Sequence, residues 1–302
     1  MSRQSKAYLF GLAAVLCWST VATAFKLSLA HLSPAQLLFF AALVSWLLLG
    51  GMLALKGELV RVLSVSRSDC LASLVFGAIN PCAYYLVLFQ AYALLPAQEA
   101  QAINYTWALT MALLAVPLLG HRLRLQELAA ALVCYLGVLV ISTRGELLTL
   151  EFANGQGVAL ALASTVLWAL YWILNARDQR DPVQGLFLNF SFGVPLVALY
   201  CFWQGEFSGL SLAGLPGAVY VGVFEMGLSF VLWLNAMRYT ESTARISNLI
   251  FISPFLSLVF IYFLLGEPIL PSTLWGLGLI LTGLLLQQLR RREPVPVSEV
   301  NT

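Results

Sequence analysis

Long apolar runs, separated by short polar connections, account for almost the whole chain. The predicted spans are 7–29, 34–55, 70–94, 97–119, 126–143, 155–176, 183–203, 214–237, 242–265 and 271–289. Most approach about 20 residues, the length that an α-helix needs to cross the hydrocarbon core of a bilayer. Runs such as 109–119 stay apolar without alternating, which excludes an outer-membrane β-barrel. The pattern predicts an all-α integral membrane protein with ten transmembrane helices.

Composition agrees with this pattern. Apolar residues make up 60% of the 302 positions and charged residues only 10%, whereas soluble domains carry roughly 25% charged residues. The short connections leave no room for a separate soluble domain. The first run is too long for the core of a signal peptide and is followed by further spans, so we expect it to remain as the first helix.

Charges and cysteines argue against several kinds of partner. The net charge is +2, and the charged residues are dispersed along the chain, so no nucleic acid is expected to bind. The cysteines are odd in number and lack CxxC spacing, and we expect them to pack as small apolar groups. They are Cys17, Cys70, Cys82, Cys134 and Cys201. We therefore predict no disulfide, no metal and no cofactor.

Basic residues set the expected orientation. With the N-terminus in the cytoplasm, thirteen Lys and Arg residues lie inside, against Lys26 and Arg144 outside, and Arg245 falls within a span. The thirteen are Arg3, Lys6, Lys56, Arg61, Arg67, Arg122, Arg124, Arg177, Arg180, Arg238, Arg290, Arg291 and Arg292. By the positive-inside rule, both termini are predicted to be cytoplasmic.

The two halves of the chain show a weak internal repeat. Gly77 and Gly222 are 145 residues apart, and Trp18 and Trp168 are 150 apart. Each half holds five spans, so the second copy must enter the membrane from the opposite side. We predict two inverted five-helix repeats, 1–145 and 146–290, and a cytoplasmic tail, 291–302. Such halves can rock about a central site, which suits a transporter.

Glu225 is the sharpest chemical signal, because it lies among apolar neighbours in the middle of the eighth span. An unpaired carboxylate there costs several kcal/mol. It could bind a substrate ammonium or carry a coupled proton, or it could be a protonated packing group. Asn80 occupies the equivalent position in the first repeat. One turn away, Tyr84 extends this candidate lining.

The fourth span has a polar face that is unsuited to lipid. Gln101, Asn104 and Trp107 share that face on a 3.6-residue helix, whereas Tyr105 points about 100° away. Asn104 could simply bond to another helix. Its position beside Trp107 favours a cavity wall.

Aromatic residues form a stripe on the sixth span. Trp168 and Tyr171 lie on it, and Trp172 is close enough to the end of the span to be an interface anchor. Trp18 is equivalent to Trp168 in the repeat. These two indole rings could be facing walls that stack a planar or cationic ligand, or they could be packing residues.

These motifs resemble the EamA-type, ten-helix branch of the drug/metabolite transporter superfamily. The segments concerned are Gly11–Thr20, Glu99–Trp107, Leu167–Tyr171, Pro254 and Leu265–Glu267. Within the family, the Trp-Ser-Thr and Asn-Tyr-x-Trp patterns are most similar to aromatic amino acid exporters. The resemblance implies a carrier of the bacterial inner membrane whose central cavity is lined at Trp18, Tyr84, Tyr105, Trp107 and Trp168.

The chain departs from the family pattern at a few positions. Gly120-His121 stands where the second repeat has Gly266-Glu267, and Ala108 stands where a proline commonly follows the tryptophan. Glu225 also lies outside the pattern that the resemblance carries over, which weakens inference of the substrate from the exporter.

We therefore expect a secondary transporter that exports small organic metabolites by alternating access, with amino acids, aromatic ones included, as the favoured substrates. An intramembrane enzyme and a channel or sensor remain alternatives. An enzyme is poorly supported, because HExxH is absent and the histidines, His31 and His121, lie near loops. The expected partners are the small-molecule substrate and membrane lipid, and a monomer and a homodimer are both compatible with the sequence.

Overall fold

The apolar runs fold as helices throughout the part of the chain that the structure covers. A computed structural model describes residues 2–120, 125–147, 154–240, 246 and 248–288. His121, Arg122, Arg124, Arg245 and the predicted tail, 291–302, lie outside these ranges. No strand occurs among the described residues. The predicted all-α fold is confirmed.

The first repeat begins with α1 (Arg3–Leu29) and α2 (Pro34–Leu55), followed by a short connecting helix, α3 (Leu59–Leu63). The remaining elements are α4 (Arg67–Gly77), a π-helical segment (Ala78–Ala83), α5 (Tyr84–Leu94), α6 (Ala97–Asn104), α7 (Trp107–Leu119) and α8 (Leu125–Ser142).

The second repeat begins with α9 (Gly155–Asn175) and α10 (Pro182–Trp203). The remaining elements are a 3-10 turn (Leu212–Gly214), α11 (Leu215–Tyr220), a π segment (Val221–Glu225), α12 (Leu228–Tyr239), a 3-10 segment (Asn248–Ile252), α14 (Ser253–Phe260), a π segment (Ile261–Leu265) and α15 (Pro271–Gln288).

When adjacent elements are joined into continuous helical stretches, ten stretches match the predicted spans. Eight are long and apolar enough to cross a membrane, and two shorter apolar helices, Leu249–Leu265 and Pro271–Gln287, complete the set within the described residues. Large apolar side chains such as Leu9, Leu12 and Leu16 on α1 are about half exposed. Lipid would cover such side chains, so the protein is a multi-pass membrane protein.

Local sequence sets the helix ends. Ser33 accepts a hydrogen bond from the Gln36 backbone N–H at 3.1 Å, while the Gln36 side chain accepts one from the Ser33 N–H at 3.0 Å. This capping box and Pro34 in the first turn start α2. Asp181 caps α10 by accepting from Val183 and Gln184. The polar residues between the apolar runs therefore act as helix start signals.

The third and eighth spans are both broken near their middles. In the third, Asn80 leaves the helical region, with φ −135° and ψ 113°, directly before Pro81, as expected for a residue preceding proline. The eighth is interrupted by the π segment Val221–Glu225. These breaks occupy equivalent places in the two repeats, and such irregular turns are frequent at functional sites.

Glycine contacts show how the repeats pack against each other. A Cβ on Gly137 would lie 2.5 Å from the carbonyl oxygen of Gly276, and one on Gly283 would lie 2.7 Å from that of Ala130. Residues 130 and 137 are each 146 positions before 276 and 283. The close contact between α8 and α15 therefore occurs twice with its partners exchanged, as a pseudo-twofold axis between two halves requires.

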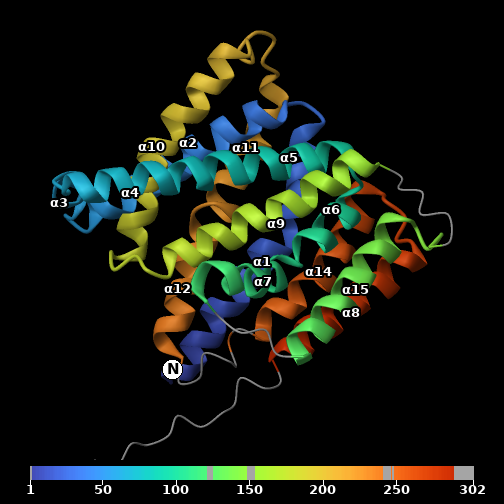
Figure 1. Cartoon of the computed structure of the whole chain (residues 1–302). Helices are drawn as coiled ribbons and strands as arrows, with labels where there is room; N and C mark the ends of the chain where they lie inside the picture. Colours follow the sequence, from blue (N-terminus) through green and yellow to red (C-terminus); the bar gives the residue numbers. More distant parts are fainter. Residues whose placement is uncertain (1, 121–124, 148–153, 241–245, 247, 289–302) are drawn as a thin grey trace, which may run out of the picture.

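The helices cross at several angles around the centre of the molecule (Figure 1). The α8 and α15 helices run together along one side, whereas α5 and α9 lie against each other across the bundle. Helix α1 packs on α12 and α14, so the first helix of one repeat is surrounded by elements of the other. The centre of the fold is thus built from both repeats.

Candidate functional site

A cavity of about 580 Å³ lies between the two repeats. That volume falls within the range of roughly 300–1,000 Å³ that is typical of small-molecule sites. Its walls come from α1, α5, α6, α7, α9, α12, α15 and the turn before α14. Five of the eight tryptophans of the chain line it: Trp18, Trp107, Trp168, Trp172 and Trp233.

Trp168 is the centre of one aromatic wall. Its ring stacks on Tyr84, with the centroids 4.4 Å apart and the planes 24° apart, and on Tyr171 at 5.5 Å and 19°. Trp172 and Phe230 approach it edge to face at 5.8 and 6.2 Å. The geometry orients an indole face that is held by neighbours from both repeats.

A second group of rings lies around Trp18. Its centroid is 5.3 Å from that of Trp233 and 6.4 Å from that of Phe230. Trp107 stacks on Trp172 at 6.4 Å with an interplanar angle of 22°. Phe230 contacts both Trp18 and Trp168, so it joins the two aromatic groups into one lining.

Polar groups occur at a few points of the lining. The Asn104 amide donates a hydrogen bond to Ser164 Oγ at 3.1 Å. Glu225, the last residue of its π segment, accepts one on Oε1 from the Tyr85 hydroxyl at 3.1 Å. Gln101 also lines the cavity. The site therefore offers one carboxylate and two amides within aromatic surroundings.

Seven of the nine predicted site residues line this cavity. They are Trp18, Tyr84, Asn104, Tyr105, Trp107, Trp168 and Glu225. Tyr171 lies behind Trp168, with 4% of its surface exposed. Asn80 is 1% exposed at the break of the third span. Neither Tyr171 nor Asn80 lines the cavity.

Several residues that line the cavity were not predicted from the sequence. Phe25 and Tyr92 lie in apolar runs that contain many similar aromatics. Trp233 follows Glu225 by eight residues, a helical spacing that could have placed it on the same face. Trp172 lies one turn beyond Trp168, but its place near the end of a span made an interface anchor the simpler interpretation. Phe251 is equivalent to Tyr105, 146 residues earlier.

The cavity extends toward the end of the bundle at which α1 begins. Ala176, Trp233 and Gln287 line it there, and α12 ends beside the start of α1, where Tyr239 stacks on Phe10 at 5.8 Å. Toward the opposite end, the Phe25 ring packs against Phe89 at 4.8 Å and Tyr92 at 5.1 Å. These three rings, which we call the aromatic plug, lie at that end of the cavity.

Polar contacts between the repeats lie beyond the plug. Gln98 donates to the carbonyl oxygen of Pro268 at 2.9 Å and accepts from the Thr273 hydroxyl at 2.8 Å. The Ala97 N–H donates to Glu267 Oε1 at 3.1 Å. These bonds join the start of α6 to the segment before α15 and to the first turn of α15. The two repeats are thus held together at this end, which we call the bonded end.

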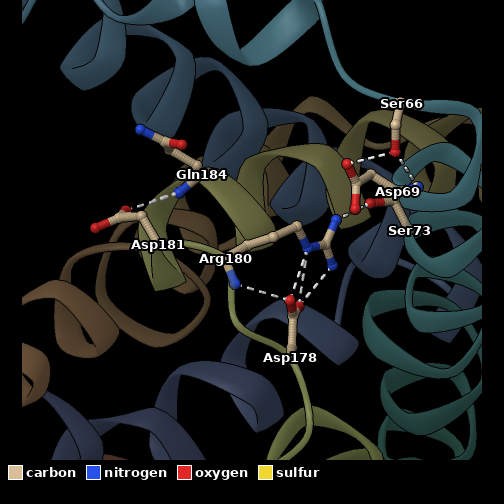
Figure 2. A network of polar contacts seen from close by, with 7 residues as sticks. All are labelled: Ser66, Asp69, Ser73, Asp178, Arg180, Asp181 and Gln184. Atoms are coloured by element: carbon tan, nitrogen blue, oxygen red, sulfur yellow. Dashed lines mark hydrogen bonds and ion pairs between the residues drawn. The ribbon is translucent and has the colours of Figure 1, made fainter.

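A different network lies between α9 and α10 (Figure 2). Arg180 donates to Asp178 through Nε and Nη2 and to Ser73 Oγ on α4 through Nη1. Burial raises the pKa of the Asp178 carboxyl, but the hydrogen bonds and charge of Arg180 together lower it by a larger amount. The pKa of Asp178 therefore lies below its ordinary value. The network fixes the α9–α10 loop, in the second repeat, to α4, in the first.

Metal chemistry has no visible support in the described part of the chain. Among residues 2–120, 125–147, 154–240, 246 and 248–288, no three His, Cys, Asp or Glu side chains are grouped to hold a metal ion.

A duplicated five-helix architecture with a cavity between its halves defines a class of membrane transport proteins. The EamA-like transporter family model matches residues 5–143 and again residues 155–287. The chain belongs to this family. Its substrate is accordingly a small molecule, and the family resemblance inferred from the motifs is confirmed.

Individual relatives support the same class. The aromatic amino acid exporter YddG of Ancylobacter novellus is 29% identical over 244 residues, which cover 79% of this chain and 81% of the exporter. An uncharacterized transporter of Clostridium kluyveri is 24% identical over 290 residues, with 92% and 91% covered. A crystal structure that is 24% identical superposes with a TM-score of 0.66 over 95% of this chain and 99% of the other, which shows the shared fold.

Proposed function

We propose that the protein exports amino acids, aromatic ones included, across the bacterial inner membrane by alternating access, with both termini in the cytoplasm. The observation that carries this proposal is the cavity between the repeats, whose lining includes five tryptophans and one carboxylate, Glu225. Indole and phenol faces bind planar side chains by stacking. The name of the Ancylobacter novellus relative supports the same substrate class.

Each part of an α-amino acid has a counterpart in the lining. Glu225 is the acceptor for the ammonium group, because it is a carboxylate with one hydrogen bond from Tyr85 and it lines the cavity. The amides of Gln101 and Asn104 provide N–H donors for the substrate carboxylate. The aromatic rings of the lining, Trp18 among them, provide apolar surfaces for the side chain. Recognition therefore combines one charge contact with aromatic stacking.

The cavity and the bonded end define a transport cycle. With the N-terminus in the cytoplasm, the cavity faces inward, and the Phe25 plug and the Gln98 bonds close the external side. Release outside requires the repeats to separate at the bonded end and to close around Trp233 and Gln287. Inverted repeats that rock against each other produce such an exchange.

A counterflow assay tests the proposed function. Purified protein in liposomes preloaded with unlabelled tryptophan should accumulate labelled tryptophan from outside, with saturation and trans-stimulation. A panel containing polyamines and aromatic cations should compete less well than aromatic amino acids. A channel would show flux without trans-stimulation, and an enzyme would return a changed compound, so either result would contradict the proposal.

A further inference from the structure

A second cleft, of about 410 Å³, lies at the bonded end. Its charged lining residues are Lys26, Glu99 and Arg144 from the first repeat and Glu267 from the second. This cleft and the central cavity have no lining residue in common. It is therefore a separate feature, on the side where the proposed function expects the substrate to leave.

Glu99, which lines this cleft, has an unsatisfied carboxylate oxygen. Its side chain is 1% exposed, and its Oε1 pairs with Arg144 Nε at 3.3 Å. Its Oε2 is buried and has no hydrogen-bond partner among the described residues. Leaving a buried carboxylate oxygen unpaired is costly, so a donor that reaches it gains more binding free energy than it would at the surface.

Glu267, in the second repeat, also has one bonded and one unpartnered carboxylate oxygen. Its Oε1 accepts the N–H of Ala97 at 3.1 Å, whereas its Oε2 is buried without a partner in the described part of the chain. Ala97 is two residues before Glu99, so the carboxylates approach one cleft from opposite repeats. Both oxygens are shielded from the cleft, so a cation reaches them only when the two side chains turn toward it. An ammonium group carries three N–H donors, enough to bond to both carboxylates.

The cationic residues of the cleft differ in their availability. Lys26 Nζ donates to the carbonyl oxygens of Tyr92 at 2.9 Å and Leu95 at 3.0 Å, so it is used inside the protein. Arg144 is 52% exposed and pairs through Nε. In the contacts of the described residues, its terminal nitrogens remain for another acceptor, and a guanidinium binds a carboxylate well.

We propose that this cleft is a second binding site for the zwitterionic substrate, used on its way out, in which Glu99 and Glu267 bind the ammonium and Arg144 binds the carboxylate. Two cationic and two anionic side chains line the cleft, so its charge balance suits a zwitterion better than an ion of one sign. The inference rests on the proposed function, because it assumes an amino acid substrate.

The plug provides the route between the two sites. Tyr92 and Phe25 line the central cavity, and the Tyr92 carbonyl accepts from Lys26, which lines the cleft. Movement of the plug would therefore connect one site to the other.

Sided transport measurements test this second site. Right-side-out and inside-out vesicles are compared for wild type, Glu267→Gln and Glu99→Gln, with labelled tryptophan as the probe. We expect each substitution to raise the apparent KM for external tryptophan about tenfold, and to leave the apparent KM at the cytoplasmic face unchanged. Glu146→Gln is the matched control, because Glu146 is an exposed carboxylate at the same end and does not line the cleft.

Competitors separate binding from a mere latch between the repeats. External tryptamine, which has only the ammonium, should inhibit both variants less than wild type, while indole-3-propionate, which has only the carboxylate, should inhibit all three alike. If inhibition by every competitor and the apparent KM at both faces changed equally in the variants, Glu99 and Glu267 would only hold the repeats together. That result would overturn the second site. Wild-type KM values in both variants would also overturn it. No counterflow of tryptophan by the wild type would instead refute the proposed function, and the second site with it.

Discussion

Trp168 makes more aromatic contacts than any other residue described above, since Tyr84, Tyr171, Trp172 and Phe230 all lie around its ring. We expect Trp168→Ala to reduce counterflow about tenfold, because stacking contacts contribute roughly 0.5–1.5 kcal/mol each. The measurement is the counterflow rate, normalised to the amount of protein in the membrane.

The control for this substitution is Trp275→Ala, because Trp275 is 76% exposed and does not line the cavity. It should transport like the wild type. An equal loss of membrane protein and of transport in Trp168→Ala would favour a packing role for the indole ring.

Glu225→Gln keeps the shape of the side chain and its bond from Tyr85, but removes the charge. If the carboxylate binds the substrate ammonium, the apparent affinity for amino acids should fall at every pH from about 5.5 to about 8.5 at which the wild type is ionised. If it carries a proton, counterflow should persist while the response to an imposed pH gradient is lost. Wild-type behaviour in both assays would make Glu225 a packing residue.

At this scale five of the predicted aromatic residues and two of the predicted polar ones line the cavity, and several of the lining residues that were not predicted are aromatic. A carboxylate or amide within an apolar run is conspicuous because it is costly there, and both Glu225 and Asn104 line the cavity. Aromatic residues are common in membrane helices, so composition does not distinguish Phe25 or Trp233 from residues that face lipid. Only the packing of several helices determines which aromatic residues face the cavity.

At the scale of single elements, the ion pair between Asp178 and Arg180 in the loop between α9 and α10 predicts a pH-dependent stability. The Asp178 pKa is lowered by Arg180, so the pair stabilises the fold fully above the ordinary aspartate value of about 3.9 and loses this contribution as the pH falls through the lowered pKa. We expect Asp178→Asn to cost about 1–3 kcal/mol at neutral pH. The difference from wild type should shrink below about pH 4.

Thermal unfolding in detergent, repeated from neutral to acidic pH, measures this effect. Asp181→Asn is the control, because Asp181 caps α10 and asparagine caps a helix about as well. A pH-independent destabilisation by Asp178→Asn would show that the loop depends on shape and not on the ion pair.

The contact between α8 and α15 can be tested at neighbouring glycines. A Cβ on Gly276 would lie 2.6 Å from the Gly137 carbonyl oxygen, whereas one on Gly278 would meet no atom within 4 Å. We expect Gly276→Ala to lower stability by about 1–3 kcal/mol through overpacking. Gly278→Ala should be neutral or slightly stabilising. Equal melting temperatures for the two variants in detergent would contradict this close packing.

The positions of the spans could be predicted from hydropathy, but hydropathy alone does not show their interruptions. Apart from Asn80 and Glu225, the third and eighth spans stay largely apolar through the breaks at Ala78–Ala83 and Val221–Glu225. A window of apolar residues gives the same signal whether its backbone is continuous or broken. Pro81 marks one of the breaks, while the other has no proline and depends on tertiary packing.

For the whole molecule, the distribution of charge predicts the orientation. In a background without the five native cysteines, Ser208→Cys should react with a membrane-impermeant maleimide in intact cells. Ser2→Cys should react only after lysis, because the N-terminus is predicted to be cytoplasmic. Labelling at Ser2 but not at Ser208 in intact cells would reverse the orientation and the direction of the proposed cycle.

The repeat could be predicted from paired positions such as Trp18 and Trp168, since equivalent residues keep their spacing. The end at which the cavity opens could not be predicted. It depends on how one repeat is tilted against the other, and neither hydropathy nor loop charge records that tilt. The Phe25 plug and the Gln98 bonds become visible only when the two repeats are seen together.

The symmetric breaks in the third and eighth spans have an energetic consequence. If two identical halves exchanged conformations, the inward-facing and outward-facing states would have equal free energies, because each would be the other viewed from the opposite side of the membrane. Any preference between the states must therefore come from positions where the halves differ. Asn80 against Glu225 and Tyr105 against Phe251 are such positions, and they occur at the centre of the molecule. The resting state of such a carrier is thus determined by the residues that break its own symmetry. If the proposed binding at Glu225 holds, the substrate is expected to change which side the carrier prefers to face.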